Sequence, residues 1–505
     1  MKPPVLDIFV DAPDHLVNKA AWALGTMLAP LGARARLVRA RPAAPDCVLA
    51  YAPAPVPGVP TIPASRAAHD LIAGDWTLPA GSYAPLEVRG RRVVAAFPVG
   101  ADGSRSGAGG DEVGGAGFAV PADLVASAFV LLACWDEHTN AARDVQDRFP
   151  FAASVFATEP ALDIAEPAVD AYGRLLAGLI GERLTALGRP PLEPPAWGDG
   201  SSPFAVALTH DVDGLPRWIA RAWPAAGKRA ALALKARDVP RARFEAGLLT
   251  YHLTHDVPHG VDPYWTFPEL LAREDALGVD STFFIVASHG HPLDGSSPAV
   301  YHRRLPDLLR LLRRAGRELA LHGNDRDRVD LEGLTDDRGH LAERAATIVE
   351  GMRYHYLRCL YHETLPLLER AGFAYDTSLA FAEREGFRCG TAYPFHPYDL
   401  AAEAPLALLE LPLAVMDTTL LAPKYRALAS EQAAAAAQAV IERVERSGGG
   451  VAILWHHNHF HPYVGRGYGE AYWSLVDWAR QRGALLCSAG TLARRWRHRT
   501  GEDEL

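Results

Sequence analysis

One strand-like stretch constrains this chain more than any other, because it ends in two carboxylates. Residues 204–214 read Phe-Ala-Val-Ala-Leu-Thr-His-Asp-Val-Asp-Gly, so a short apolar run stops at Asp211 and Asp213. Carboxylates at the end of a buried strand are costly unless they meet a metal, a cation or a substrate. The alternative is a polar turn in which an aspartate caps the next helix. We favour a functional site, because the same pattern recurs twice downstream.

Two further apolar stretches end in residues that bind metals or transfer protons. Residues 318–321 lead into His322, and residues 451–455 lead into a His-His-Asn-His run that begins at His456. Strand-like and helix-like segments alternate through this part of the chain, which predicts a parallel α/β barrel. Such barrels place the carboxyl ends of their strands on one face and keep their sites there. We therefore expect the three stretches to build one site.

At these positions the chain resembles the metal-dependent polysaccharide deacetylases, also called carbohydrate esterase family four. The resemblance spans about residues 204–490. Asp211 and Asp213 resemble the paired-aspartate motif of the family, in which a catalytic base precedes a metal ligand. Residues 353–356, Arg-Tyr-His-Tyr, resemble its arginine motif, and residues 454–456, Leu-Trp-His, resemble its Leu-x-His motif. The resemblance implies a distorted (β/α) barrel of the polysaccharide deacetylase type.

The resemblance also implies a metal centre. Asp213 and His322 would be its first ligands, and a carboxylate with an imidazole suits zinc and other first-row metals. A divalent metal can bring the pKa of a bound water from 15.7 to about 7. Asp211 would then take the proton from that water. We expect a divalent metal cofactor, with zinc as the first candidate.

The remaining catalytic roles follow from the same resemblance. Arg353 would hold Asp211 in its charged form, and Asp376 would in turn hold Arg353. The amide N–H of Tyr356 would stabilise the oxyanion, a role commonly worth about 10²–10³ in rate per donor. His456 would protonate the leaving amine. Three neighbouring histidines are also candidates for that acid: His457, His459 and His461.

One position departs from the family pattern. The second metal histidine of the family should lie four residues after His322, where this chain has Arg326. A guanidinium stays protonated and cannot coordinate, whereas a catalytic zinc needs three protein ligands and a water. We expect His355 to be the third ligand, because it lies in the arginine motif where the family usually has a non-ligating proline. Asn324 and Asp325 are the alternatives.

The first part of the chain predicts a smaller α/β domain. Short strands and helices alternate over about the first 120 residues, and residues 118–195 are helical in pattern. The proline-rich run 188–195 predicts a stiff linker. We therefore place an N-terminal α/β accessory domain at 1–195 and the barrel at 196–505. The residues give no chemical reason for the accessory domain.

A charged patch follows the first of these predicted helices. It consists of Glu137, Asp144, Asp147 and Arg148. We interpret the patch as a solvated face. Contact with the barrel is the alternative.

Composition narrows the partners and the compartment. The net charge of −9 argues against nucleic acid, because phosphate binding needs a concentrated basic face. No run of about 18 uncharged apolar residues is present, so we expect no transmembrane segment and a cytoplasmic protein. Five cysteines without a Cys-x-x-Cys pair indicate ordinary thiols in a reducing compartment.

These observations predict a metal-dependent hydrolase that removes acetyl groups from an N- or O-acetylated sugar or polysaccharide. Its partner would be an acetylated glycan or amino sugar. One alternative is a hydrolase of another small amide or ureide. The other is a non-catalytic sugar-binding protein on a degenerate barrel, for which Arg326 is the evidence. Against it, five positions of the motifs are retained: Asp211, Asp213, Arg353, Asp376 and His456.

Overall fold

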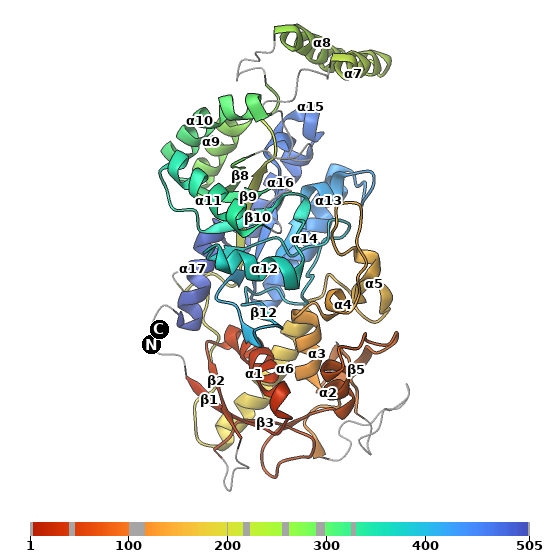
Figure 1. Cartoon of the computed structure of the whole chain (residues 1–505), viewed down its shortest axis with the longest axis vertical. Coiled ribbons are helices and arrows are strands. Elements are labelled where there is room, and N and C mark those ends of the chain that lie inside the picture. The colour runs from red at the N-terminus through yellow and green to blue at the C-terminus, as the bar shows by residue number, and fades with distance from the viewer. Residues whose placement is uncertain are drawn as a thin grey trace.

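The structure is a computed structural model, and it describes residues 4–39, 46–99, 117–198, 200–215, 223–254, 262–288, 298–324 and 330–502. Two sheets organise these residues. A small sheet lies near one end of the molecule in Figure 1, and a large sheet with its helices fills the middle. Helices α7 (Trp223–Lys235) and α8 (Val239–Thr254) project at the opposite end.

The large sheet has nine strands in the order β14-β11-β10-β9-β8-β7-β16-β15, with β17 paired to β7. All of its strand pairings are parallel. Its strands are β7 (Ala205–Val212), β8 (Ser281–Val286), β9 (Glu318–Gly323), β10 (Gly351–Tyr354), β11 (Tyr375–Asp376), β14 (Leu409–Glu410), β15 (Leu413–Met416), β16 (Gly450–Leu454) and β17 (Leu485–Cys487).

This sheet curls round until its ends meet. Strands β14 and β15 stand at the two ends of the strand order, yet only Leu411 and Pro412 separate them in the chain. Proline lacks the backbone N–H that a continuous ladder needs, which accounts for the break between the two short strands. The predicted fold class, a distorted (β/α) barrel preceded by a smaller α/β unit, is confirmed.

Helices cover the outside of the barrel (Figure 1). They are α9 (Phe267–Leu277), α10 (Pro298–Arg314), α11 (Leu331–Ala345), α12 (Tyr361–Arg370), α14 (Ser430–Ser447), α16 (Tyr468–Gln481) and α17 (Ala489–Thr500). Helix α14 illustrates why they pack there. Ala433, Ala437, Val440 and Val444 recur every three or four residues and are buried against the sheet side. The helix ends at Gly448, whose φ of 76° is the left-handed conformation that glycine adopts without strain.

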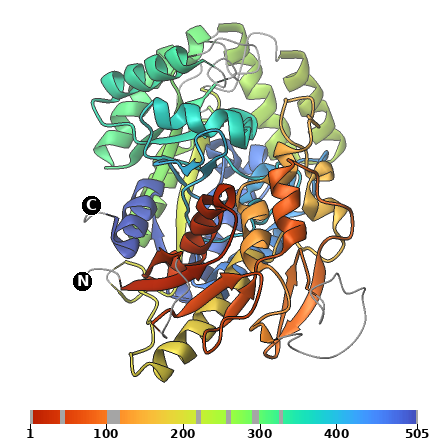
Figure 2. The ribbon, with the colours of Figure 1, turned by 60° about the horizontal axis from the view of Figure 1, so that its bottom comes forward.

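The N-terminal unit is built round a four-stranded parallel sheet in the order β2-β1-β3-β4. Figure 2 brings this sheet forward. Its main elements are β1 (Val5–Val10), α1 (Asp14–Leu28), β2 (Arg34–Val38), β3 (Leu49–Ala52), β4 (Thr61–Pro63), α2 (Arg66–Ala73), the hairpin β5 (Ala84–Val88) and β6 (Arg91–Ala95), α3 (Leu124–Leu132) and α6 (Ala168–Ala186).

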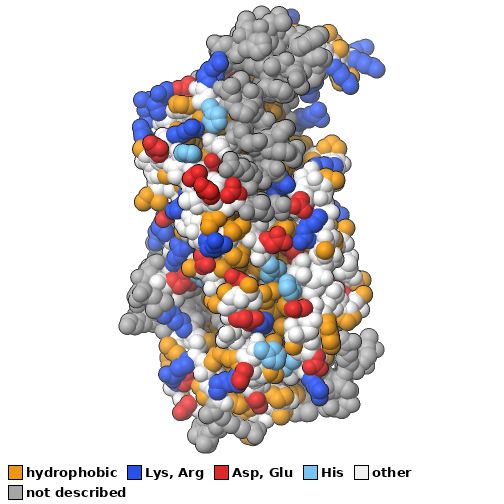
Figure 3. Space-filling model, viewed as in Figure 1, with side chains coloured by type: hydrophobic (Ala, Val, Ile, Leu, Met, Phe, Trp, Pro, Cys, Tyr) orange, Lys and Arg blue, Asp and Glu red, His pale blue; other side chains and the backbone are white. Residues whose placement is uncertain are grey.

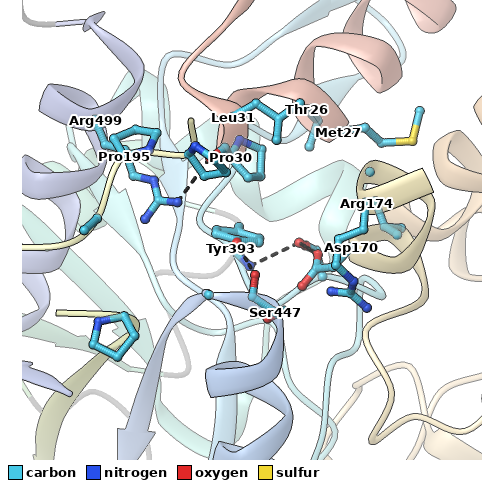
Figure 4. Close-up of a pocket in the computed structure, with 17 residues that line it drawn as sticks. Thr26, Met27, Pro30, Leu31, Asp170, Arg174, Pro195, Tyr393, Ser447 and Arg499 are labelled. Carbon is cyan, nitrogen blue, oxygen red and sulfur yellow. Dashed lines mark hydrogen bonds between the residues drawn. The ribbon is translucent and has the colours of Figure 1, made fainter. Parts of the chain in front are cut away.

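The N-terminal unit and the barrel share one hydrophobic core. Leu131 and Val169 of the first part belong to the same buried cluster as Phe387 and Cys389 of the second. A cavity of about 320 Å³ also lies between them, lined by α1, α6 and residues of the barrel such as Tyr393 (Figure 4). The buried contacts therefore run across residue 195, and the boundary placed there stays a prediction.

The charged patch after α3 is not a solvated face. Glu137 is 4% exposed and Arg148 is 7% exposed. Glu137 forms a fully buried ion pair with Arg388 of the barrel, and Arg148 donates to the carbonyl of Tyr356. The solvated-face interpretation was wrong for Glu137 and Arg148, because these two charged side chains have partners on the barrel.

The surface in Figure 3 mixes charges of both signs. Lysine and arginine side chains are interspersed with aspartate and glutamate on this face. Among the helices in the described part of the chain, none combines the length and the apolar character that a membrane crossing requires.

Candidate metal centre

The carboxyl ends of four barrel strands supply the site. Asp211 lies in β7, His322 in β9 and Arg353 in β10, while His456 comes two residues after the end of β16. The register of β9 and β10 pairs His322 with Arg353. Asp213 comes just after β7. The parallel arrangement thus brings residues more than 240 positions apart to one end of the barrel, as the sequence predicted.

Three side chains converge as possible metal ligands. The Asp213 Oδ1 atom lies 3.2 Å from His322 Nε2, and Asp213 Oδ2 lies 3.7 Å from His355 Nε2. One donor atom from each of the three residues lies within 4.8 Å of the others. The structure therefore brings His355 to the two ligands that the resemblance implies.

The surroundings of these atoms fit a cation. Asp213 Oδ1 and His322 Nε2 are buried, and neither has a hydrogen bond of good geometry among the described residues. Such atoms are costly unless something binds them. His322 Nδ1 donates to the carbonyl of Arg353 at 2.9 Å, which leaves the Nε2 lone pair facing Asp213. A carboxylate and two imidazoles form a donor set that zinc prefers.

The charge of Asp213 is stabilised by its neighbours. Burial acts to raise the pKa of Asp213, but the nearby imidazoles of His355, His456 and His322 lower that pKa well below its usual range. For His322, burial acts to lower the pKa, whereas the charges of Asp211 and Asp213 raise it overall. The Asp213 side chain is 34% exposed, and its carboxylate stays ionised, as a metal ligand must.

Of the alternative third ligands, one can be located. The Asn324 side-chain amide donates to Ser288 Oγ at 3.0 Å and to Asp337 Oδ2 at 2.9 Å, so it is held by other groups. Asp325 and Arg326 lie outside the described residues.

Arg353, in the arginine motif, contacts Asp211. Arg353 Nη1 donates to Asp211 Oδ1 at 2.8 Å and to Thr209 Oγ1 at 2.8 Å. Arg353 Nε donates to the carbonyl of Thr377 at 3.1 Å. The second carboxylate oxygen of Asp211 lies 3.7 Å from His322 Nε2. One oxygen of Asp211 is thus fixed, and the other faces the metal ligands.

Asp376 does not contact Arg353 directly. No hydrogen bond or ion pair joins the two side chains among the described contacts. Asp376 accepts hydrogen bonds from the backbone N–H and the hydroxyl of Ser378, both at 2.8 Å, and pairs with Glu410. Burial raises the pKa of both acids, which favours a shared proton. Asp376 therefore holds the 377–378 turn, whose Thr377 carbonyl accepts from Arg353. The expected direct pairing of Asp376 with Arg353 was wrong, because this turn lies between them.

His456 is oriented by a carboxylate that sequence reasoning missed. Its Nδ1 donates to Asp417 Oδ1 at 2.6 Å, and its backbone N–H donates to Asp417 Oδ2 at 2.7 Å. The His456 Nε2 atom then lies 3.5 Å from Asp213 Oδ2. His459 Nδ1 also donates to Asp417, at 2.6 Å. Asp417 directly follows strand β15. The pattern that identified the other site residues, a polar residue at the end of an apolar run, therefore also applied to Asp417.

Electrostatics favours a protonated His456. Burial acts to lower its pKa, but the charges of Asp417 and Asp213 raise the pKa to about 10. Burial likewise acts to raise the pKa of Asp417, and the positive charges of His456 and His459 lower it instead. Asp417, His456 and His459 also lie close enough to hold an ion. Both Asp417 oxygens already accept imidazole N–H groups, however. We therefore interpret Asp417 as stabilising a protonated His456, with His459 as a second hydrogen-bond donor.

His457 has a different environment from its neighbours. It is buried, and its Nδ1 lies 3.0 Å from the carbonyl of Asp211. Burial lowers its pKa to about 4. Because its ring stacks on Phe267 at 4.9 Å, we regard it as packing beneath the site.

The loop after β10 has an unusual backbone. Tyr356 has φ 60° and ψ 13°, and Leu357 has φ 57°. For residues with a side chain this left-handed conformation costs about 1–2 kcal/mol each. The ring of Tyr356 stacks on that of His355 with centroids 4.0 Å apart. This loop therefore places both the candidate third ligand and the candidate oxyanion donor.

A pocket of about 110 Å³ opens on the site. Its walls include Asp211, Asp213, His355, Tyr356 and His456. Residues outside the motifs complete it, among them Arg148, Met416, Thr418, Lys424 and Tyr425.

Comparison with known proteins gives one sequence-family match and several similar solved structures. A sequence family of unknown function, DUF7033, matches residues 85–185. Comparison with curated proteins gives no match. Among solved structures, a provisionally assigned polysaccharide deacetylase from Mycobacterium smegmatis is similar over 60% of this chain and 93% of its own, with 22% identity and a TM-score of 0.40.

Two other solved structures show the range of these similarities. The PuuE allantoinase covers 60% of this chain and 94% of its own, at 13% identity and a TM-score of 0.40. A pseudoenzyme of carbohydrate esterase family four from Bacillus anthracis covers 60% and 70%, at 10% identity and a TM-score of 0.30. The similar structures thus include proteins named as a polysaccharide deacetylase, an allantoinase and a pseudoenzyme.

Proposed function

We propose that this protein is a metal-dependent hydrolase that removes acetyl groups from an N- or O-acetylated sugar or polysaccharide. One observation carries the proposal. Two members of a candidate metal set, a carboxylate fixed by an arginine and a histidine fixed by a carboxylate all line one small pocket. Hydrolysis of an amide or ester needs these groups together.

In this proposal Asp213, His322 and His355 hold the metal, and zinc suits their donors best. When bound, the metal would make a water acidic and polarise the acetyl carbonyl. Asp211 takes the proton of that water on the carboxylate oxygen that faces the ligands. Arg353 keeps the other oxygen of Asp211 hydrogen-bonded, so the carboxylate cannot turn away.

The other two steps use His456 and Tyr356, which also line the pocket. His456 carries a proton on Nε2 and delivers it to the leaving nitrogen or oxygen. Asp417 accepts from His456 Nδ1 and so fixes the ring and stabilises its charge. The amide N–H of Tyr356 supports the negative oxygen that forms on the acetyl carbon.

The size of the pocket supports a small acyl group. About 110 Å³ is well below the roughly 300–1,000 Å³ of pockets that enclose whole drug-sized ligands. The acetyl group would enter and the rest of the sugar would stay outside. The same size also suits a small amide or ureide, which is the second candidate substrate class.

Acetate release tests the proposal. The protein stripped by a chelator and then reloaded with zinc is assayed with N-acetylglucosamine oligomers, O-acetylated glycans and cyclic ureides, with Asp211→Asn as the control. We expect zinc-dependent acetate release in the wild type and almost none in the control. Turnover of the ureide alone would favour the second candidate. Zinc binding without turnover of any substrate would favour a sugar-binding protein.

A further inference from the structure

The left-handed loop at Tyr356 is held from outside the barrel. Arg148 Nη1 donates to the carbonyl of Tyr356 at 2.8 Å. In the reverse direction, Arg358 Nε donates to the carbonyl of Gln146 at 2.8 Å. Two hydrogen bonds thus clasp the 355–358 loop to a loop of the N-terminal unit.

The loop that contributes Arg148 is itself well ordered by its own contacts. Asp144 Oδ1 accepts from the backbone N–H of Gln146 at 2.9 Å and from that of Arg148 at 3.0 Å. Asp144 Oδ2 accepts from Arg148 Nε at 2.9 Å and from Nη2 at 2.6 Å. Arg148 Nη2 also reaches the hydroxyl of Tyr425, another wall of the pocket, at 3.3 Å. Asp144 and Tyr425 therefore fix the Arg148 guanidinium independently of its bond to Tyr356.

We propose that Arg148 is a positioning residue through which the N-terminal unit completes the metal centre. A strained backbone persists only where its surroundings hold it. The bond to the Tyr356 carbonyl fixes the turn that sets the direction of the His355 ring and of the Tyr356 N–H. The inference rests on the proposed function of the site and gives the N-terminal unit a part in it.

Arg148 differs in this respect from the other ties between the two parts. Arg443 of α14 pairs with Glu166 at 2.7 Å, and Lys19 of α1 pairs with Glu403. These ion pairs also join the N-terminal unit to the barrel, but none of their residues lines the site pocket. Arg443→Met is therefore a matched control, because it removes an inter-unit arginine without touching the site.

The test compares full-length Arg148→Met, Arg148→Lys and Arg443→Met with the wild type. Amide hydrogen exchange is followed in the segment 353–359, and zinc affinity is measured by competition with a chelator. We expect Arg148→Met to speed exchange in that segment and to weaken zinc binding, each by at least about tenfold. Lysine keeps one donor and should restore part of both. Arg443→Met should change neither.

Turnover adds a third reading if the wild type releases acetate. Arg148→Met should then lower kcat far more than it changes KM, because the loop positions reacting groups and does not hold the sugar. If Arg148→Met and Arg443→Met behave alike in exchange and in zinc affinity, Arg148 is only a structural tie and the inference is wrong. Should Arg148→Met not fold, Asp144→Asn loosens the same guanidinium and must show the same pattern.

These readings separate the two proposals. A wild type that never releases acetate contradicts the proposed function, yet exchange and zinc affinity still report on Arg148. A wild type that turns over while Arg148→Met keeps its rate, zinc affinity and exchange contradicts only the positioning role.

Discussion

Buried aspartates behave differently in the two parts of this molecule. In the N-terminal unit, burial raises the pKa of Asp123 to about 7 and those of Asp136 and Asp170 to about 6. Backbone N–H groups and hydroxyls are their hydrogen-bond donors; Asp170, for example, accepts from Thr391 Oγ1 at 2.7 Å and from a backbone N–H at 3.1 Å. These acids hold loops in place.

In the barrel, burial acts in the same direction but does not decide the outcome. Imidazoles surround Asp213 and Asp417, and the pKa of each is lowered. Asp417 is as fully buried as Asp123, so depth of burial alone does not separate a structural carboxylate from a functional one. The partner does, because a carboxylate kept ionised beside histidines can bind a metal or hold a protonated imidazole.

Among the site carboxylates, Asp211 is the one whose substitution should have the largest effect, and Asp211→Asn tests it. The amide keeps the shape and can still bond Arg353, but it cannot accept a proton. We expect turnover to fall by about 10³-fold or more, because a general base commonly contributes about 10²–10⁴ in rate. The zinc content should not change. Acetate release and zinc content are measured on the same preparation. A variant that kept most of the wild-type rate would show that Asp211 is not the base.

His456→Ala tests the role of Asp417 by removing the histidine that Asp417 orients. Removal of the proposed acid should lower turnover by about 10²–10³-fold while zinc stays bound. Asp417→Asn should give a smaller loss of the same kind, because His456 remains but loses its brace. If zinc is lost from His456→Ala, then His456 belongs to the coordination sphere, and His457 becomes the better candidate for the acid.

His355→Ala tests the third ligand. Loss of outer-shell partners commonly costs 10–100-fold in metal affinity, so loss of a direct ligand should cost at least about 100-fold. Competition with a chelator gives the affinity. Binding as tight as that of the wild type would place the third ligand elsewhere, with residue 325 as the next position to test.

Asp170→Asn tests the structural side of the contrast, with the smallest expected effect. Since the pKa of Asp170 is about 6 when folded and 3.8 ordinarily, the folded state holds a proton that the unfolded state releases. This acid therefore lowers the free energy of unfolding as pH rises from about 4 to 6, by up to about 3 kcal/mol. The asparagine variant should lack that part of the slope.

Urea unfolding at several pH values between 4 and 7 measures this slope in the wild type and in Asp170→Asn. The lowered pKa of Asp417 has the opposite sign, because its stabilisation is present above the ordinary pKa and is lost as pH falls. Equal slopes in the wild type and in Asp170→Asn would mean that folding does not raise the pKa of Asp170.

The sequence predicted those parts of the molecule that follow from strand ends. Apolar runs that stop at Asp211, His322 and His456 became barrel strands with these residues at one end. The approach of His355 to Asp213 followed from its place in the arginine motif.

Long-range pairing could not be read from the residues. Asp417 gave a usable signal, an acid after a strand-like run, but nothing in the chain tied it to a histidine 39 positions later. Arg148 looked like surface charge, because only folding brings it to a carbonyl 208 positions away. Asp376 was expected beside Arg353, and a two-residue turn comes between them.

Metal stoichiometry tests the central claim most directly. The purified wild type, Asp213→Asn and His322→Ala are dialysed against zinc, freed of excess, and analysed for zinc per chain. The proposed centre predicts about one tightly bound zinc in the wild type and a large loss in both variants, with all three folded by circular dichroism. A wild type without bound zinc, or variants that retain it fully, would contradict the centre and the hydrolase built on it.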